Sequence, residues 1–273
     1  MTTANRNPVP SSSIQNGRNS RRTSGQRLLV GTASIAIACI AAACSSSSGS
    51  TPPTTQESVL PTTAGSSTQT TVNSADQSLA TAAVLQLSDM PTGATWTSQG
   101  SASTGSSQLG SVSSSQMATC EGTTVGSAQV STSSSPGFGS STATVQDQVQ
   151  VFPNATAAMT DASLFSAAKA PTCVAGVISS DIASQLSQAA GSSAKVDQIS
   201  STVTPIAKQG DFTAEIQLVI PVTALGQTHT EYISLVEVVL GRVESQLLLT
   251  SGDAPFSDQW AVELAGKAVQ RMA

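Results

Sequence analysis

The sequence has few of the residues from which most active sites are built. Its 273 residues include one histidine, His229, and only 3% aromatic and 10% charged residues. A single histidine excludes a metal site made of several imidazoles, and the low aromatic content excludes base stacking as a way of holding nucleic acid. No G-x-S-x-G nucleophile motif and no Gly-Lys pair followed by Ser or Thr occurs. We therefore expect neither a cofactor nor a metal.

Carboxylates are the remaining candidates for catalysis. Glu231 and Glu237 share the parity of His229 along one predicted strand, and Glu215 and Glu244 lie on the predicted solvated faces of its neighbours. Acid–base catalysis needs two carboxyl groups roughly 5–9 Å apart with different pKa values. Alternating polar residues on a solvated sheet face give such distances by chance, and His229 fits an exposed strand end. We therefore predict that the chain is not an enzyme.

An export signal is indicated at the N-terminus. Four arginines (Arg18, Arg21, Arg22 and Arg27) precede an apolar run of 16 residues at 28–43. This run is shorter than the roughly 20 residues that cross a bilayer comfortably, and the arginines favour a cytoplasmic position for its N-terminal side. A basic flank, a short apolar core and small final residues are typical of a signal peptide, which we place at residues 1–43.

Cys44 follows this run directly. The sequence Ala41-Ala42-Ala43-Cys44-Ser45 resembles the lipobox of bacterial lipoproteins, although a lipobox usually has Leu at the position of Ala41. The resemblance implies that Cys44 is acylated on its sulfur, with palmitate as an expected chain, and becomes the mature N-terminus at the outer face of the cell membrane. Two acyl chains give stable anchoring. Ordinary signal cleavage, an uncleaved short anchor, and twin-arginine rather than Sec export remain alternatives.

The chain that begins at Cys44 is acidic. Five of the 11 basic residues precede Cys44 and all 16 acidic residues follow it, which leaves six basic residues and a net charge of −10. This charge argues against nucleic acid as a partner and against polybasic docking on anionic lipid. Residues 44–73 are rich in Ser, Thr and Pro, and we expect a disordered tether with a reach of roughly 30 Å.

Residues 74–273 are expected to form a single α+β domain. The spacing of apolar residues predicts four helices: from Ser74 to about Leu87, over 155–169, over 179–190 and from about Asp253 to the C-terminus. The second of these should stop at Pro171-Thr172-Cys173. Alternation of apolar and polar residues predicts strands at 143–151, 198–206, 212–222, 231–240 and 243–249. The last three strands should form an antiparallel meander because their connections are short. Ser/Gly-rich residues 97–118 and the stretch up to Ser141 are expected to be loops. Asp147 interrupts an apolar strand face and suggests a bulge or a sheet edge.

Cys120 and Cys173 are the only cysteines after Cys44. An even pair in an exported protein predicts a disulfide, and the pair lacks the C-x-x-C spacing of redox sites. We therefore expect a structural bond, which should stabilise the fold by about 4 kcal/mol in the chain-entropy model.

One combination of features resembles a known family. The stretch Val84-Leu85-Gln86-Leu87-Ser88-Asp89-Met90-Pro91-Thr92-Gly93 with Trp96 is followed by Cys120, by Val149-Val151-Phe152 and by a helix that ends at Cys173. Together they resemble actinobacterial exported lipoproteins related to the extracytoplasmic sensor domain of PknH-type receptor kinases, over most of residues 78–272. The resemblance implies a mixed sheet with packed helices and a cleft for an unknown ligand. That family usually has two disulfides, whereas this chain has cysteines for one.

These observations favour a non-enzymatic, membrane-anchored envelope lipoprotein with a ligand-binding or sensor-like domain. Its expected partners are the membrane, through Cys44, and an unknown small-molecule or envelope ligand. A lipid or glycolipid carrier is the alternative, and it would need a large apolar cavity between sheet and helices. A cell-wall hydrolase is a weaker alternative, and it would need accessible carboxylates such as Glu231 and Glu237.

Overall fold

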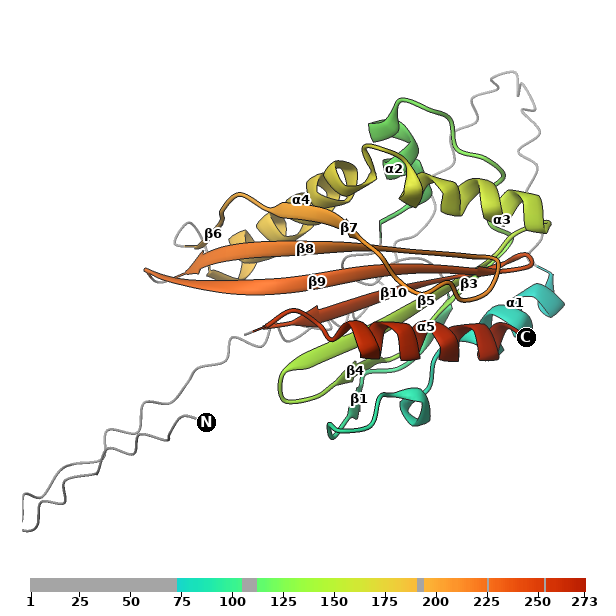
Figure 1. The fold of residues 1–273 in the computed structure, drawn as a ribbon, viewed down its shortest axis with the longest axis horizontal. Coiled ribbons are helices and arrows are strands. Elements are labelled where there is room, and N and C mark those ends of the chain that lie inside the picture. The colour runs from blue at the N-terminus through green and yellow to red at the C-terminus, as the bar shows by residue number, and fades with distance from the viewer. Residues whose placement is uncertain (1–72, 105–111, 191–193, 225, 253) are drawn as a thin grey trace, which may run out of the picture. The chain divides into compact units, whose positions relative to one another are not determined.

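The domain is a large antiparallel sheet with helices packed on both faces, as the α+β prediction required (Figure 1). A computed structural model describes residues 73–104, 112–190, 194–224, 226–252 and 254–273. The predicted signal peptide, the tether up to residue 72 and Cys44 lie outside the described residues. The first described helix begins at Ser74, where the domain was predicted to start.

The centre of the sheet is the predicted meander. Strands β8 (Phe212–Ala224), β9 (Gln227–Leu240) and β10 (Val243–Ser251) pair antiparallel in sequence order, and β5 (Ala143–Val151) pairs with the whole of β10. Strands β6 (Ala194–Val196) and β7 (Ser200–Thr204) extend the sheet beside β8. Repeated apolar residues place β8, β9 and β10 in a buried position, which explains why the sequence predicts these three strands well.

Two groups of helices cover the sheet. Helices α1 (Ser74–Ala83) and α5 (Asp258–Met272) pack on one face, whereas α2 (Ser114–Glu121), α3 (Ala155–Ala162) and α4 (Ala170–Ala190) pack on the other. Short 3-10 segments lie at Leu87–Asp89 and Ser163–Ser166. On the α1–α5 face, Trp260 contacts both Trp96 and Phe256 edge to face, with ring centroids 5.8 and 5.7 Å apart. Both sheet faces are therefore buried.

Within the described residues, no single helix is long and apolar enough to cross a membrane. The pair Ala155–Ser166 and Ala170–Ser184 reaches the necessary length and composition only together, and the two parts are bent by 85°.

The Ser/Gly-rich stretch that was predicted to be loop contains structure, so that prediction was wrong. It forms β1 (Thr97–Gln99), β2 (Ser103–Thr104), α2, β3 (Ser131–Ser134) and β4 (Gly137–Gly139). All four serines and threonines of β3 are buried, and their small side chains let α1 pack closely against the strand. The side chain of Gln77 on α1 joins them, because it accepts a hydrogen bond from Ser131 Oγ at 2.7 Å and donates one to Ser133 Oγ at 3.0 Å. Apolar periodicity cannot detect such a strand.

The predicted helix stop at Pro171 was also wrong. Helix α3 ends at Ala162, and Pro171 lies in the first turn of α4, which starts at Ala170. Proline lacks a backbone N–H, but the first turn of a helix has no intrahelical acceptor for that group and tolerates it. The residue therefore starts a helix instead of ending one.

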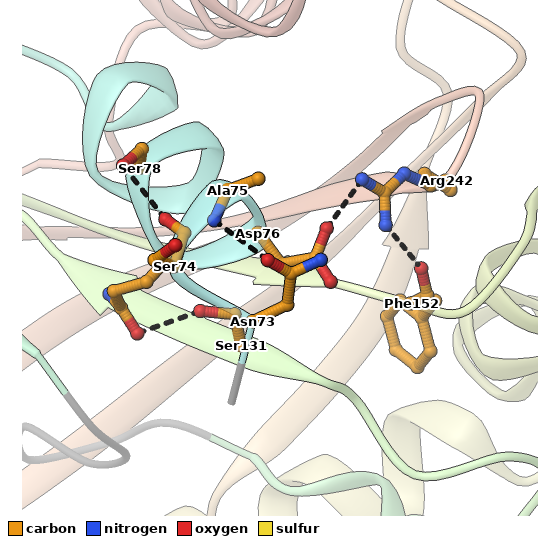
Figure 2. Close-up of polar contacts among 9 residues, drawn as sticks. Asn73, Ser74, Ala75, Asp76, Ser78, Ser131, Phe152 and Arg242 are labelled. Carbon is orange, nitrogen blue, oxygen red and sulfur yellow. Dashed lines mark hydrogen bonds and ion pairs between the residues drawn. The ribbon is translucent and has the colours of Figure 1, made fainter. Parts of the chain in front are cut away.

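An ion pair fastens the start of α1 to the turn between β9 and β10 (Figure 2). Arg242 Nη2 lies 2.6 Å from Asp76 Oδ1, and Arg242 Nη1 donates a hydrogen bond to the carbonyl oxygen of Phe152 at 3.3 Å. Asn73 caps the same helix, because its Oδ1 accepts a hydrogen bond from the backbone N–H of Ala75 at 3.0 Å. The side chain of Asp76 is only 13% exposed, so water screens the pair less than it screens a surface ion pair.

We expect Arg242→Ala to lower the free energy of unfolding by about 1–2 kcal/mol, since it leaves a largely buried carboxylate without its charged donor. Urea unfolding followed by circular dichroism would measure this loss. Lys195→Ala provides the matched control, because the Lys195–Asp197 pair has the same 2.6 Å separation but a lysine that is 67% exposed. Equal losses in the two variants would contradict the assigned role of Arg242.

Candidate functional site: a buried carboxyl cluster

Three carboxyl groups meet beneath helices α2 and α3. Glu237 and Glu244 lie on the same face of the sheet and are diagonal neighbours, since Glu237 is opposite Gln246 and Glu244 is opposite Val239 in the β9–β10 register. Asp161 reaches them from α3. The three residues are 1–2% exposed. We call Asp161, Glu237 and Glu244 the carboxyl cluster.

The carboxyl groups of the cluster lie next to one another without a fixed hydrogen-bond donor between them. The Glu244 carboxyl is within hydrogen-bonding reach of those of both Glu237 and Asp161. No donor satisfies either oxygen of Glu244 or Oε1 of Glu237. Two adjacent carboxyl groups form a hydrogen bond only when one of them carries a proton, so the arrangement requires shared protons.

Burial sets the ionisation of the cluster. Loss of hydration raises the pKa of Glu237 from 4.5 to about 8. Burial, and then the negative charge of Glu237, raise the pKa of Glu244 well above its ordinary value, and burial also raises the pKa of Asp161. The three ion pairs of the described residues involve other carboxylates, so a basic partner does not offset this effect. Glu237 is therefore largely protonated at neutral pH, and burial shifts the pKa values of Glu244 and Asp161 in the same direction.

The amide of Gln246 connects the cluster to the chain segment that leads into α2. Its Nε2 donates to Glu237 Oε2 at 3.2 Å and to the carbonyl oxygen of Val112 at 3.4 Å, and its Oε1 accepts from the N–H of Val112 at 3.2 Å. Ser114 Oγ donates to Asp161 Oδ2 at 2.7 Å. Residues 112–114 are thus bonded to both ends of the row Asp161, Glu244, Glu237.

The far end of α2 is held by the predicted disulfide. Cys120 and Cys173 are bonded, with their Cα atoms 5.7 Å apart, and they join α2 to α4. Cys173 is 2% exposed and packs in the apolar cluster that also contains Met117. Helix α2 is therefore attached by a covalent bond at one end and by polar contacts at the other.

The predicted solvated positions of Glu215 and Glu244 were wrong, and Glu237 is buried as well. Glu237 and Glu244 lie under α2 and α3, and Glu215 is 2% exposed on the opposite face, where Gln217 Nε2 donates to its Oε1 at 3.0 Å. Burial raises the pKa of Glu215. Alternation shows which side chains share a face, but it does not show that helices cover both faces.

His229 and Glu231 do not join the cluster. His229 is exposed on β9 opposite Val222, as a strand-end residue was expected to be, and Glu231 is half-buried opposite Ile220. Six residues of strand separate Glu231 from Glu237, a distance of roughly 20 Å. Among the described residues, no group of three or more His, Cys, Asp or Glu side chains is arranged to hold a metal ion.

Two members of this site, Asp161 and Gln246, were not predicted from the sequence. A signal for Asp161 was present, because it falls on the same helical stripe as Ala158, Ala162 and Phe165, where a charged residue is out of place. Gln246 gave no such signal, since it alternates normally with Leu247.

A second buried carboxyl group lies on the α1–α5 face. Asp147 Oδ2 accepts a hydrogen bond from the N–H of Leu85 at 2.7 Å, and its Oδ1 accepts one from Ser245 Oγ at 2.8 Å. Burial raises its pKa from 3.8 to about 7. Asp147 pairs in register with Leu247 and does not lie at a sheet edge. On its other side the pairing of β5 shifts by one residue, between Gln148↔Ser134 and Val145↔Phe138, so a bulge does lie beside Asp147. The residue interrupts the apolar face because it binds the chain just after α1.

An open hollow of about 380 Å³ lies on the surface near the start of α3. Small and mostly polar residues line it: Gly126, Ser127, Asn154, Thr156, Ala157 and Thr160. It has neither the size nor the apolar lining that a buried lipid chain requires.

Comparisons with known proteins give distant structural likenesses. No protein-family model and no curated protein sequence matches the chain. Among solved structures, the extracellular domain of PknH from Mycobacterium tuberculosis is similar, with a TM-score of 0.33 and 14% identity, over 72% of this chain and 95% of that domain. This is the domain type to which the sequence resemblance pointed. A likeness at this level carries no argument about function, and lipoprotein character and actinobacterial origin remain predictions.

Proposed function

We propose that the chain is an exported, non-enzymatic domain, anchored at the outer face of the cell membrane through lipid on Cys44, with a ligand-binding or sensor-like role. The observation that carries the proposal is the Cys120–Cys173 bond. Structural disulfides persist in oxidising compartments and are rare in the cytosol. The export signal predicted at residues 1–43 independently favours the same location.

The burial of the glutamates supports a non-enzymatic role. An acid–base pair must reach its substrate, whereas Glu237 and Glu244 are 1% exposed under helices α2 and α3. Glu231, the other candidate, lies roughly 20 Å along the strand from Glu237. A hydrolase built on these residues would need a different arrangement.

The carboxyl cluster supports the sensor-like part of the proposal. Burying carboxyl groups costs free energy that apolar side chains of similar volume would not cost. Groups with strongly raised pKa values are enriched at functional sites. The lipid-carrier alternative gains no comparable support, because the described hollow is open and lined by small side chains, and the apolar clusters on both sheet faces consist of buried residues.

Replacement of the lipidated cysteine tests the anchoring. We expect Cys44→Ser, expressed in an actinobacterial host, to move the protein from the membrane fraction to the soluble or secreted fraction and to remove the mass of the acyl chains from the intact protein. Cys39→Ser is the matched control, since Cys39 lies in the apolar core that is removed with the signal. Unchanged membrane retention of Cys44→Ser, or a wild-type mass without acyl chains, would contradict the proposal.

A further inference from the structure

Residues 112–121 are held on the sheet by two different kinds of attachment. The disulfide at Cys120 is permanent under oxidising conditions, whereas the attachment at residues 112–114 runs through Gln246 and the carboxyl cluster. Only the second attachment contains groups that gain and lose protons. The two ends of the segment should therefore respond differently to pH.

We propose that the carboxyl cluster is a proton-dependent switch: protons shared among Asp161, Glu244 and Glu237 hold residues 112–121 on the sheet, and loss of these protons releases the end of the segment at Val112. The inference concerns the domain itself and does not depend on export or lipidation. It goes beyond the proposed function because it names the stimulus and the moving segment.

The contacts form a closed path that begins and ends on the same segment. Ser114 binds Asp161, Asp161 and Glu237 both contact Glu244, and Gln246 connects Glu237 to Val112. Each carboxyl–carboxyl contact in this path requires a proton. When the protons leave, the two contacts become repulsions between adjacent anions in a medium of low dielectric constant.

Among the described residues, the charges of the cluster meet neutral donors, Ser114 Oγ on Asp161 and Gln246 Nε2 on Glu237, and none of the three ion pairs includes them. The residues that face the cluster are uncharged: Ser114 from α2, Ala214 from β8, Gln246 from β10, and Gln148 and Gln150 from β5, by the strand register. Asp147, from the other sheet face, adds further repulsion on Glu237. Glu121, the single carboxylate of α2, lies at the distant end of that helix beside Cys173. Hydration is the remaining way to stabilise the anions, and lifting residues 112–114 admits water.

The direction of the pH effect follows from the raised pKa values. The folded cluster keeps protons that the unfolded chain, with an ordinary glutamate pKa of 4.5, would release. The stabilisation from the closed segment is therefore complete below about pH 4.5 and is lost as the pH rises through about 8. Release at high pH, with the rest of the sheet intact, is the expected behaviour.

Hydrogen–deuterium exchange on the full chain between pH 5 and pH 9 tests the switch. After correction for intrinsic exchange rates, we expect the amides of residues 112–118 to exchange at least about tenfold faster at pH 9 than at pH 5. Peptides from β8 and β9 serve as the internal control and should change little. The double variant Glu237→Gln/Glu244→Gln keeps Asp161 as the single ionisable group of the cluster. Without neighbouring anions to repel it, the segment should stay protected at pH 9.

Three outcomes would overturn the proposal. Equal protection of residues 112–118 at both pH values in the wild type is the first, and unchanged pH dependence in the double variant is the second. The third is restored protection at pH 9 on adding calcium or sodium, which would make the cluster a cation site. If the double variant does not fold, carboxyl carbon NMR of the wild type decides the matter: titration of all three groups below pH 5 would exclude shared protons.

Discussion

Loss of the Cys120–Cys173 bond is expected to lower the free energy of unfolding by about 4 kcal/mol. The bond closes a loop across a sequence separation of 53, and opening it restores the conformational freedom of that loop in the unfolded chain. The variant Cys120→Ser/Cys173→Ser also places a hydroxyl where Cys173 is buried, which adds to the loss. Urea unfolding of the oxidised wild type and the double variant would measure the difference.

Reduction distinguishes the bond from the substitutions. A reducing agent should destabilise the wild type by a comparable amount and leave the double serine variant unchanged. A reduced wild type as stable as the oxidised one would show that the bond contributes nothing. Because 4 kcal/mol is a large share of the 5–15 kcal/mol typical of a domain, the reduced protein should be sensitive to proteolysis near 37 °C.

Asp147→Ala is expected to cost about 3 kcal/mol, since it leaves the N–H of Leu85 and the hydroxyl of Ser245 buried without their acceptor. The same change separates the end of α1 from the sheet. Thermal or urea unfolding would show the loss. Asp211→Ala is the matched control, because Asp211 also accepts a backbone hydrogen bond, from Gly241 at 2.7 Å, but is exposed. Comparable losses in the two variants would contradict the role of burial.

Asp147 also predicts a pH effect of definite sign. Burial raises its pKa from 3.8 to about 7, so the folded protein holds a proton that the unfolded chain releases. Its contribution is complete below about pH 4 and is lost as the pH rises through about 7. Asp147→Asn should therefore reduce the decline in wild-type stability over this range. If the stability of Asp147→Asn declined as steeply with pH as that of the wild type, Asp147 would not be the group that titrates in this range.

The strands of the meander could be predicted because their burial repeats with the period of a strand. Ile216, Leu218 and Ile220 alternate without interruption, and the structure places all three in one apolar cluster. The side chains on the other side of the strand include the polar residues Glu215 and Gln217, which suggest a solvent-exposed face. Helix α5 nevertheless covers this face. The burial of this face depends on a helix that is distant in sequence, so the local periodicity of the strand cannot predict it.

The candidate site was harder to predict for the same reason. Glu237 and Glu244 follow the alternation of exposed residues, and Asp161 belongs to a helix whose partner is not evident from the sequence. The proximity of these three carboxyl groups depends on the strand register and on the packing of α3, and both are features of the tertiary structure. The disulfide was predictable because cysteines in an exported chain have few other uses. Small buried residues, as in Ser131–Ser134, give no apolar signal at all.

The packing of α1 beside α5 decides which side of the domain is available to other molecules. The described chain enters at Asn73 and finishes at Ala273, both on the face that carries these two helices (Figure 1). A protein fused after Ala273 is therefore attached on that side of the sheet, opposite to α2, α3 and α4. A reporter protein fused after Ala273 would lie apart from residues 112–121. The release of residues 112–121 could therefore be followed in such a fusion protein without steric hindrance from the reporter.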